Sequence, residues 1–134
     1  MGVLIDASVL IGFERSGEEA RGWVEGREEE AFFLSVVTAS ELLHGVHRAS
    51  DPAVRSRRGA FVEAVLERFP LLDIDLATAR AHAGAWAELS AAGTPIGAHD
   101  LWLAASCLAH GLALATLNVR EFQRVPGLRV ENWS

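Results

Sequence analysis

The chain of 134 residues carries 12 basic and 18 acidic side chains, which gives a net charge of -6 with neutral histidines. Half of the residues are hydrophobic, as in a globular domain with a substantial core, and the single cysteine excludes an internal disulfide. The acidic balance argues against a nucleic-acid binder that relies on a bare basic surface, but not against one whose acidic groups carry divalent cations. Every basic residue is Arg, which excludes chemistry that needs a Lys nucleophile.

The apolar stretches are all too short to span a membrane, a task that takes roughly 18 apolar residues. The first residues also lack the basic start and the long apolar segment of a signal peptide. We therefore expect a cytoplasmic protein without a membrane partner. No repeat or long linker divides the sequence, so residues 1–134 are expected to form a single domain.

The first half of the chain alternates apolar runs with amphipathic patterns. Residues 2–6 and 31–37 are short, apolar and β-branched, and they predict two strands. Helices are expected over 7–14, from 38 to the residues before Asp51, and over 53–69, where apolar residues recur at three- and four-residue steps. The polar stretch 17–30 predicts a weak, exposed helix.

The second half continues the alternation. Strands are expected over 71–75, 112–116 and 128–131, and helices over 76–93, 100–110 and 118–124. The helix at 100–110 is apolar almost all round, which predicts that it is buried, together with Cys107 as an inert thiol. Strands separated by helices predict a doubly wound α/β domain with a mainly parallel sheet of about five strands and helices on both faces.

Four polar residues stand directly after a predicted strand or near the start of a predicted helix: Asp6, Glu41, Asp100 and Asn118. Each of them, taken alone, is well explained as part of a helix cap. Thr38 and Glu41 have the spacing of a capping box, and Asn118 and Glu121 have a looser form of it. No single one of these patterns decides between capping and function.

Taken together, the acidic residues point to a metal site. The carboxyl ends of parallel strands lie at one edge of a sheet, where ligands bind, so Asp6, Glu41 and Asp100 can converge there. Neighbouring carboxylates repel each other by about 1 kcal/mol or more per pair. A divalent cation offsets this repulsion, and oxygen ligands without an organised Cys or His set favour Mg²⁺ or Mn²⁺ over Zn²⁺.

The segments LIDASVLI, TASELLHG, DLWLAA and ATLNVREF, followed by LRVENW, resemble the PIN-domain ribonucleases. They are most similar to the VapC-type toxins of toxin–antitoxin pairs, in order and spacing along the whole chain. The resemblance implies that Asp6, Glu41 and Asp100 hold Mg²⁺. Asn118 stands at a fourth catalytic position that is often Asp, and Ser8 and Thr116 match positions that support the site.

This resemblance implies a single PIN-like domain that hydrolyses RNA phosphodiester bonds with Mg²⁺, or with Mn²⁺ in its place, as the cofactor. It also implies an antitoxin partner of the VapB kind and a homodimer. We expect Arg120 and Arg124 to bind substrate phosphate, since both are close to Asn118 in the sequence. Trp102 is the tryptophan that we would test for stacking on RNA. A groove for an antitoxin helix is expected to include Val36, Leu42, Leu43 and Val46.

Two other readings remain open at this point. Asn118 and His99, which the resemblance does not match, leave room for a catalytically inactive PIN-like module that binds RNA or protein. His99 itself fits a half-exposed helix cap or, less simply, a metal ligand or proton donor. A receiver or phosphatase domain with a phospho-accepting Asp6 is disfavoured because such sites place a Lys near the phosphate.

Overall fold

The computed structural model describes residues 2–16, 27 and 29–133. In chain order its elements are β1 (Gly2–Ile5), α1 (Ala7–Ser16), β2 (Ala31–Ser35), α3 (Val36–Arg48), α4 (Pro52–Arg68), β3 (Leu71–Leu72), α5 (Leu76–Ala92), α6 (Ala98–His110), β4 (Ala113–Thr116), α7 (Val119–Phe122) and β5 (Val130–Asn132). The helix expected over 17–30 lies almost wholly outside the described residues.

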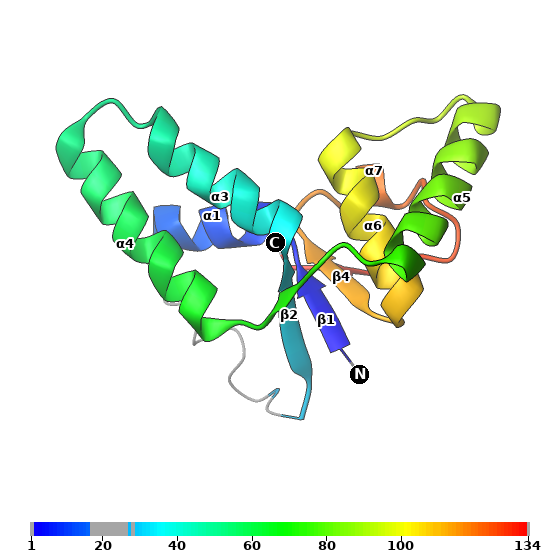
Figure 1. Cartoon of the computed structure of the whole chain (residues 1–134), viewed down its shortest axis with the longest axis horizontal. Coiled ribbons are helices and arrows are strands. Elements are labelled where there is room, and N and C mark those ends of the chain that lie inside the picture. The colour runs from blue at the N-terminus through cyan, green and yellow to red at the C-terminus, as the bar shows by residue number, and fades with distance from the viewer. Residues whose placement is uncertain (1, 17–26, 28, 134) are drawn as a thin grey trace.

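All strand pairs in the described part of the chain are parallel, and the strand order is β3-β2-β1-β4-β5. Figure 1 shows the inner strands β2, β1 and β4. The strand β1 is central, with β2 on one side and β4 on the other. The chain therefore winds outward in one direction through β2 and β3, then returns to the centre and winds the other way through β4 and β5. This confirms the expected doubly wound α/β fold and leaves β3 at an edge.

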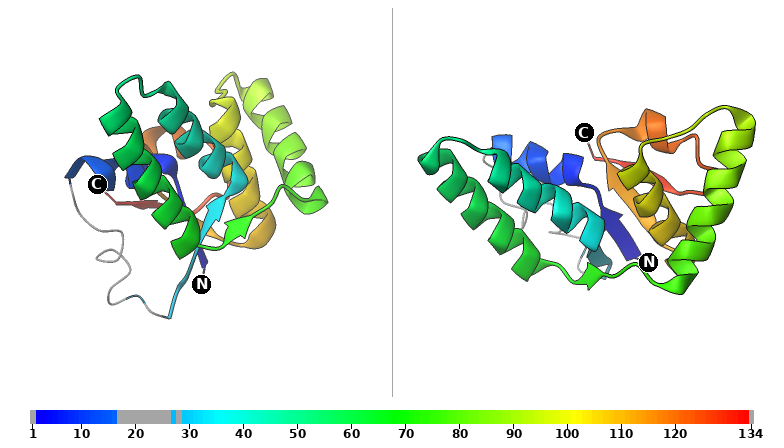
Figure 2. Two further views of the ribbon diagram at one scale, coloured as in Figure 1. Left: turned by 60° about the vertical axis from the view of Figure 1, so that its left-hand side comes forward. Right: turned by 45° about the horizontal axis from the view of Figure 1, so that its top comes forward.

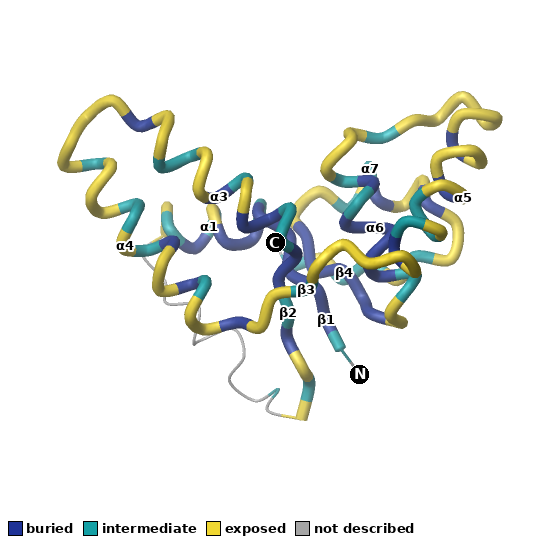
Figure 3. Tube along the Cα trace, in the orientation of Figure 1, coloured by how far each residue is buried: buried dark blue, intermediate teal, exposed yellow. Residues whose placement is uncertain are grey.

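Helices cover both faces of the sheet, with α1, α3 and α4 on one side and α5, α6 and α7 on the other (Figures 1 and 2). The central strand supplies both cores because its side chains alternate. Val3 and Ile5 pack among the apolar residues of α1, α3 and α4, whereas Leu4 packs among those of α5 and α6. Figure 3 shows the result, with buried positions along the sheet and on the inner faces of the helices.

The helix α6 is the most deeply buried of these helices, as its apolar sequence predicts. Leu103, Ala104 and Ala105 are fully buried, and Gly111 ends the helix in the left-handed conformation with φ 66°. Burial also raises the pKa of the Cys107 thiol to about 12, so this thiol is inert. Across the described part of the chain, none of the helices has the length and hydropathy needed to cross a membrane.

The start of α3 differs from the sequence-based expectation. The hydroxyl of Ser35 accepts a hydrogen bond from the Val37 amide at 3.0 Å, which makes Ser35 the N-cap. This cap outweighs the strand preference of the β-branched pair that follows, so the strand ends at Ser35 and the helix begins at Val36. The capping box expected at Thr38 and Glu41 is therefore wrong, and Glu41 lies in the second turn.

Thr38 lies inside α3 and is not its N-cap, and its side chain allows a prediction about stability. Thr38 is fully buried, and within the residues that the structure describes its Oγ1 has no hydrogen-bond partner. Replacing it by the isosteric Val removes an unsatisfied polar atom, so Thr38→Val should raise the free energy of unfolding in urea by about 1 kcal/mol.

The matched control is Thr116→Val. Thr116 is equally buried, but its Oγ1 donates a hydrogen bond of 2.8 Å to the Asp6 carboxylate. Loss of this charge-assisted bond should lower the free energy of unfolding by about 2 kcal/mol. Equal destabilisation by the two substitutions would contradict the assignment of Thr38.

Candidate active site

The candidate site lies where the winding of the sheet reverses. The strands β1 and β4 are neighbours, but their following helices go to opposite faces, and such a switch point is where open α/β sheets bind ligands. Asp6 follows β1 directly, and its backbone amide donates a hydrogen bond of 2.9 Å to the carbonyl oxygen of Ala115. Thr116 ends β4.

Asp6 is buried, with 6% of its surface exposed, and two hydroxyl groups hold its carboxylate. Ser8 Oγ donates to Asp6 Oδ2 at 2.7 Å, and Thr116 Oγ1 donates to the same oxygen at 2.8 Å. The amides of Leu117 and Asn118 in turn donate to these hydroxyl oxygens. Among the described residues no hydrogen bond reaches Oδ1, so Asp6 does not cap α1 and retains one oxygen for a ligand.

A second carboxylate pair lies at the start of α6. Asp100, in the first turn of this helix, and Glu121, on α7, both lie beside Gly97, and the charge of Glu121 contributes to a raised pKa of Asp100. Glu121 is fixed from both sides, because its Oε1 accepts from the Gly97 amide at 2.9 Å and its Oε2 from Asn118 Nδ2 at 2.8 Å. Both Asp100 and Glu121 therefore lie over Gly97, where no side chain intervenes.

Glu121 was not expected as a site residue. Its position three residues after Asn118 is a weak signal for such a role, because the same spacing fits a loose capping pattern equally well. Asn118 holds the N-cap position of α7 but makes no side-chain capping bond, and its amide group binds Glu121 instead.

The charges at this edge perturb each other. Burial raises the pKa of Asp100 to about 7, with further contributions from Glu121, Asp6 and Glu41. The pKa of Glu121 is lowered, chiefly because the Gly97 amide stabilises its charged form. The two pKa shifts have opposite directions, so Asp100 is the member of this pair that holds a proton more readily.

Glu41 is paired with a histidine side chain in this arrangement. Its Oε1 is 2.8 Å from Nδ1 of His99, which is 61% exposed and projects from the first turn of α6. His99 is thus not a helix cap, because Gly97 holds the N-cap position. Within the described residues, no three His, Cys, Asp or Glu side chains are arranged so that they could hold a metal ion as they stand.

The two arginines expected to bind phosphate are both exposed. Arg124 donates from Nη1 to the carbonyl oxygen of Pro95 at 3.0 Å, and its charge contributes to the lowered pKa of Glu121. Arg120 lies on α7, one residue before Glu121. A hydrogen bond to the Pro95 carbonyl, and not an ion pair, therefore holds Arg124 near the acidic side chains.

A hard divalent cation fits the chemistry of this donor set. The side chains available are carboxylates, Asp6 Oδ1 accepts no bond from the described residues, and repulsion together with burial keeps a proton on Asp100. Within the described chain, no Arg forms an ion pair with Asp6, Asp100 or Glu121. A cation can replace the proton of Asp100, and Glu41 can join once it leaves His99.

The raised pKa of Asp100 predicts how the metal-free protein responds to pH. The folded chain keeps a proton up to about pH 7, whereas the unfolded chain loses it near the ordinary value of 3.8. Stability is therefore lost as the pH rises between these two values. Asp100→Asn should raise the thermal midpoint in EDTA, and the gain should grow over this interval and level off above it. A gain that is the same at every pH would contradict the assignment.

Comparisons with known proteins identify the family to which this fold belongs. The family model described as "PIN domain" matches residues 3–128. The chain is 33% identical to "Ribonuclease VapC1" of Rickettsia felis, over 97% of this chain and 95% of that protein. It is 37% identical to "tRNA(fMet)-specific endonuclease VapC" of Salmonella typhimurium, over 75% of this chain and 74% of that protein.

The solved structure described as "Crystal structure of DNA bound VapBC from Salmonella typhimurium" contains a chain with the same fold. The TM-score is 0.89 at 30% identity, and the match covers 100% of this chain and 99% of that one. Family model, relatives and structure agree over nearly the whole length. The chain therefore belongs to the PIN-domain family and, within it, to the VapC group.

Proposed function

We propose that this protein is a metal-dependent endoribonuclease that hydrolyses RNA phosphodiester bonds as the toxin of a toxin–antitoxin pair. The observation that carries the proposal is the gathering of Asp6, Asp100 and Glu121 at the switch point of a VapC-group fold without an arginine counter-ion among the described residues. Relatives named ribonuclease and endonuclease support the activity. We assign residues 1–134 to a single domain and the protein to the cytoplasm, where RNA is its substrate.

We assign Mg²⁺ as the cofactor, with Mn²⁺ as a substitute, because the donors are carboxylate oxygens. Asp6, Glu41 and Asp100 would hold the ion, and Glu121 is close enough to Asp100 to assist. The bound ion supplies charge stabilisation at the phosphate and lowers the pKa of a water molecule that serves as the nucleophile.

The remaining residues of the site orient these carboxylates and the substrate. Ser8 and Thr116 fix the rotamer of Asp6 by donating to a single oxygen, which directs Oδ1 to the ligand. Asn118 does the same for Glu121. Arg124 and Arg120 contact phosphates that flank the scissile one, because they border the acidic edge and have exposed side chains.

Two substitutions test the carboxylates that are proposed to hold the metal ion. Asp6→Asn and Asp100→Asn should each lower the rate of Mg²⁺-dependent RNA cleavage by about 100-fold or more, because each removes a charged ligand of nearly unchanged size. Cleavage of a labelled RNA is followed on gels with and without EDTA. The matched control is Asp73→Asn, which makes the same chemical change after the edge strand β3 and should leave the rate unchanged.

Wild-type rates in either variant would contradict the assigned site. RNA binding without cleavage by the wild-type protein, with Mg²⁺ or Mn²⁺ present, would instead favour the alternative of a catalytically inactive binding module. Circular dichroism of each variant excludes unfolding as the cause of a lost activity.

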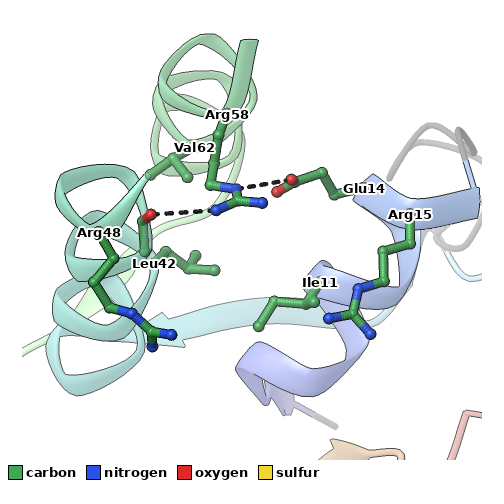
Figure 4. Close-up of a pocket in the computed structure, with 8 residues that line it drawn as sticks. Ile11, Glu14, Arg15, Leu42, Arg48, Arg58 and Val62 are labelled. Atoms are coloured by element: carbon green, nitrogen blue, oxygen red, sulfur yellow. Dashed lines mark hydrogen bonds and ion pairs between the residues drawn. The ribbon is translucent and has the colours of Figure 1, made fainter. Parts of the chain in front are cut away.

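The antitoxin partner is supported by the VapBC complex that this chain resembles and by a pocket between α1, α3 and α4. The pocket has a volume of about 270 Å³ and an apolar floor of Ile11, Leu42 and Val62 (Figure 4). Three arginines surround it: Arg15, Arg48 and Arg58. Arg58 also joins the helices, through Glu14 at 3.1 Å and the Gly45 carbonyl at 3.3 Å.

Such a pocket suits an apolar side chain on a segment that carries acidic residues. Of the residues expected to line an antitoxin groove, Leu42 is in the pocket, whereas Val36, Leu43 and Val46 are not among its lining residues. We assign this pocket to the antitoxin.

Ile11 offers a direct test because 39% of its surface is exposed and a charge there should not disrupt the core. Ile11→Asp should weaken binding of the co-expressed antitoxin, encoded by a short neighbouring reading frame, by at least about tenfold. Co-purification and calorimetry measure the effect. Leu76→Asp, at an exposed position of α5, is the control and should bind normally; equal loss in both variants would contradict the assignment.

A further inference from the structure

A second pocket, between α5 and α6, has no part in the metal site or in the pocket assigned to the antitoxin. Its volume is about 400 Å³, within the range of about 300–1,000 Å³ that is usual for small-molecule sites. The residues that line it include His82, Trp86, Ser90, Ile96, Ala98 and Trp102. Among the residues that the structure describes, no acidic or arginine side chain lines this pocket.

The pocket presents a cluster of aromatic rings. The His82 ring is stacked on Trp102, with centroids 3.6 Å apart and an angle of 17° between the planes. Trp86 meets His82 edge-on at 5.8 Å. Trp86 is nevertheless 61% exposed, so most of its flat surface faces solvent at the mouth of the pocket. Burial lowers the pKa of His82, which favours a neutral ring there.

The pocket is continuous with the acidic edge. Gly97, whose amide binds Glu121, lies between Ile96 and Ala98, which both belong to the pocket wall. Asp100 and Trp102 are two positions apart on α6, with Leu101 between them, and they project from different sides of that helix. An RNA strand that passes the start of α6 therefore meets the carboxylates on one side of the helix and the aromatic rings on the other.

The chemistry of the pocket selects its occupant. A neutral ring that stacks on tryptophan fits an apolar, uncharged lining, and polar atoms on Ser90 and His82 can contact the edge of such a ring. A phosphate does not fit, because the lining has no cation. An unpaired nucleobase has both the stacking face and the polar edge, and single-stranded RNA is bound in this way by aromatic side chains.

We propose that this pocket binds an unpaired nucleobase of the RNA substrate next to the scissile phosphate, by stacking on Trp86. This inference rests on the proposed ribonuclease function and adds a determinant of substrate choice to it. RNA in which the flanking base is paired cannot enter the pocket, so the protein should prefer loops and single strands.

The test is steady-state cleavage of a fluorescein-labelled, single-stranded RNA of mixed sequence in Mg²⁺. Trp86→Ala should raise KM by about tenfold with kcat within about threefold of wild type, because a lost stack weakens binding and leaves the carboxylates in place. Trp86→Phe, which keeps a ring, should recover most of the affinity. Leu76→Ala is the control, since it truncates another exposed side chain of α5 outside the pocket.

A double-mutant cycle identifies the base. Removing single bases from the RNA in turn should reveal one position whose loss raises KM for the wild type and has no further effect in Trp86→Ala. Independently of any variant, wild-type protein cross-linked to thiouridine-containing RNA should carry the adduct on Trp86 or His82. Unchanged KM in Trp86→Ala, or adducts only outside α5 and α6, would overturn the inference.

Two further outcomes are informative. If Trp86→Ala converts a dimer to a monomer in sedimentation and loses activity equally on intact and base-deleted RNA, the pocket is an interface between two copies of the chain and the inference is overturned. If the wild type cleaves no RNA in Mg²⁺ or Mn²⁺, the proposed function itself fails. Normal cleavage by the wild type together with unchanged KM in Trp86→Ala removes the nucleobase pocket alone.

Discussion

The site depends on electrostatic repulsion between carboxylates that the sheet topology brings to one edge. Asp6 follows the central strand, and Asp100 and Glu121 reach the same edge from α6 and α7. Burial limits the screening of these charges by water, so the protein must lower the total charge in some way. The pKa of Asp100 is accordingly raised to about 7, and hydrogen bonds from hydroxyl and amide groups stabilise the charges of Asp6 and Glu121.

The acidic residues around this edge have different kinds of hydrogen-bond partner. The network of Ser8 and Thr116 holds Asp6 in one orientation, whereas Glu41 is paired with His99. Under the proposed function, Asp6 is the ligand that is already oriented, and Glu41 would join the ligand set by exchanging His99 for the metal ion. The two helical layers make this possible, because α3 and α6 start at the same edge but pack on opposite faces of the sheet.

Much of this architecture is predictable from the sequence because it follows from local patterns. The alternation of apolar runs with amphipathic helices is sufficient for the parallel sheet, and the all-round apolar pattern of 100–110 is sufficient to bury α6. The start of α3 is predicted two residues late, at Thr38, because Val36 and Val37 favour a strand in isolation and the single hydroxyl of Ser35 reverses that preference.

The parts that could not be predicted depend on contacts between distant segments. The side chain of Glu121 is positioned by a hydrogen bond from the Gly97 amide, which is 24 residues away in the sequence. The side chains of His99 and Glu41 are in contact although 58 residues separate them. The stacked pair of His82 and Trp102 joins α5 to α6, and neither helical pattern indicates that their rings are parallel. Residue type suggested which side chains were reactive, but only the packing decides which of them meet.

The most direct test of this account is a crystal structure of the protein grown with Mn²⁺, with anomalous scattering used to locate the ion. The account predicts a single strong peak within bonding distance of Asp6 Oδ1 and the Asp100 carboxylate, with Glu41 turned from His99 toward the ion. Absence of manganese from this edge at saturating concentration, with Glu41 still on His99 and Asp100 still on Glu121, would contradict it.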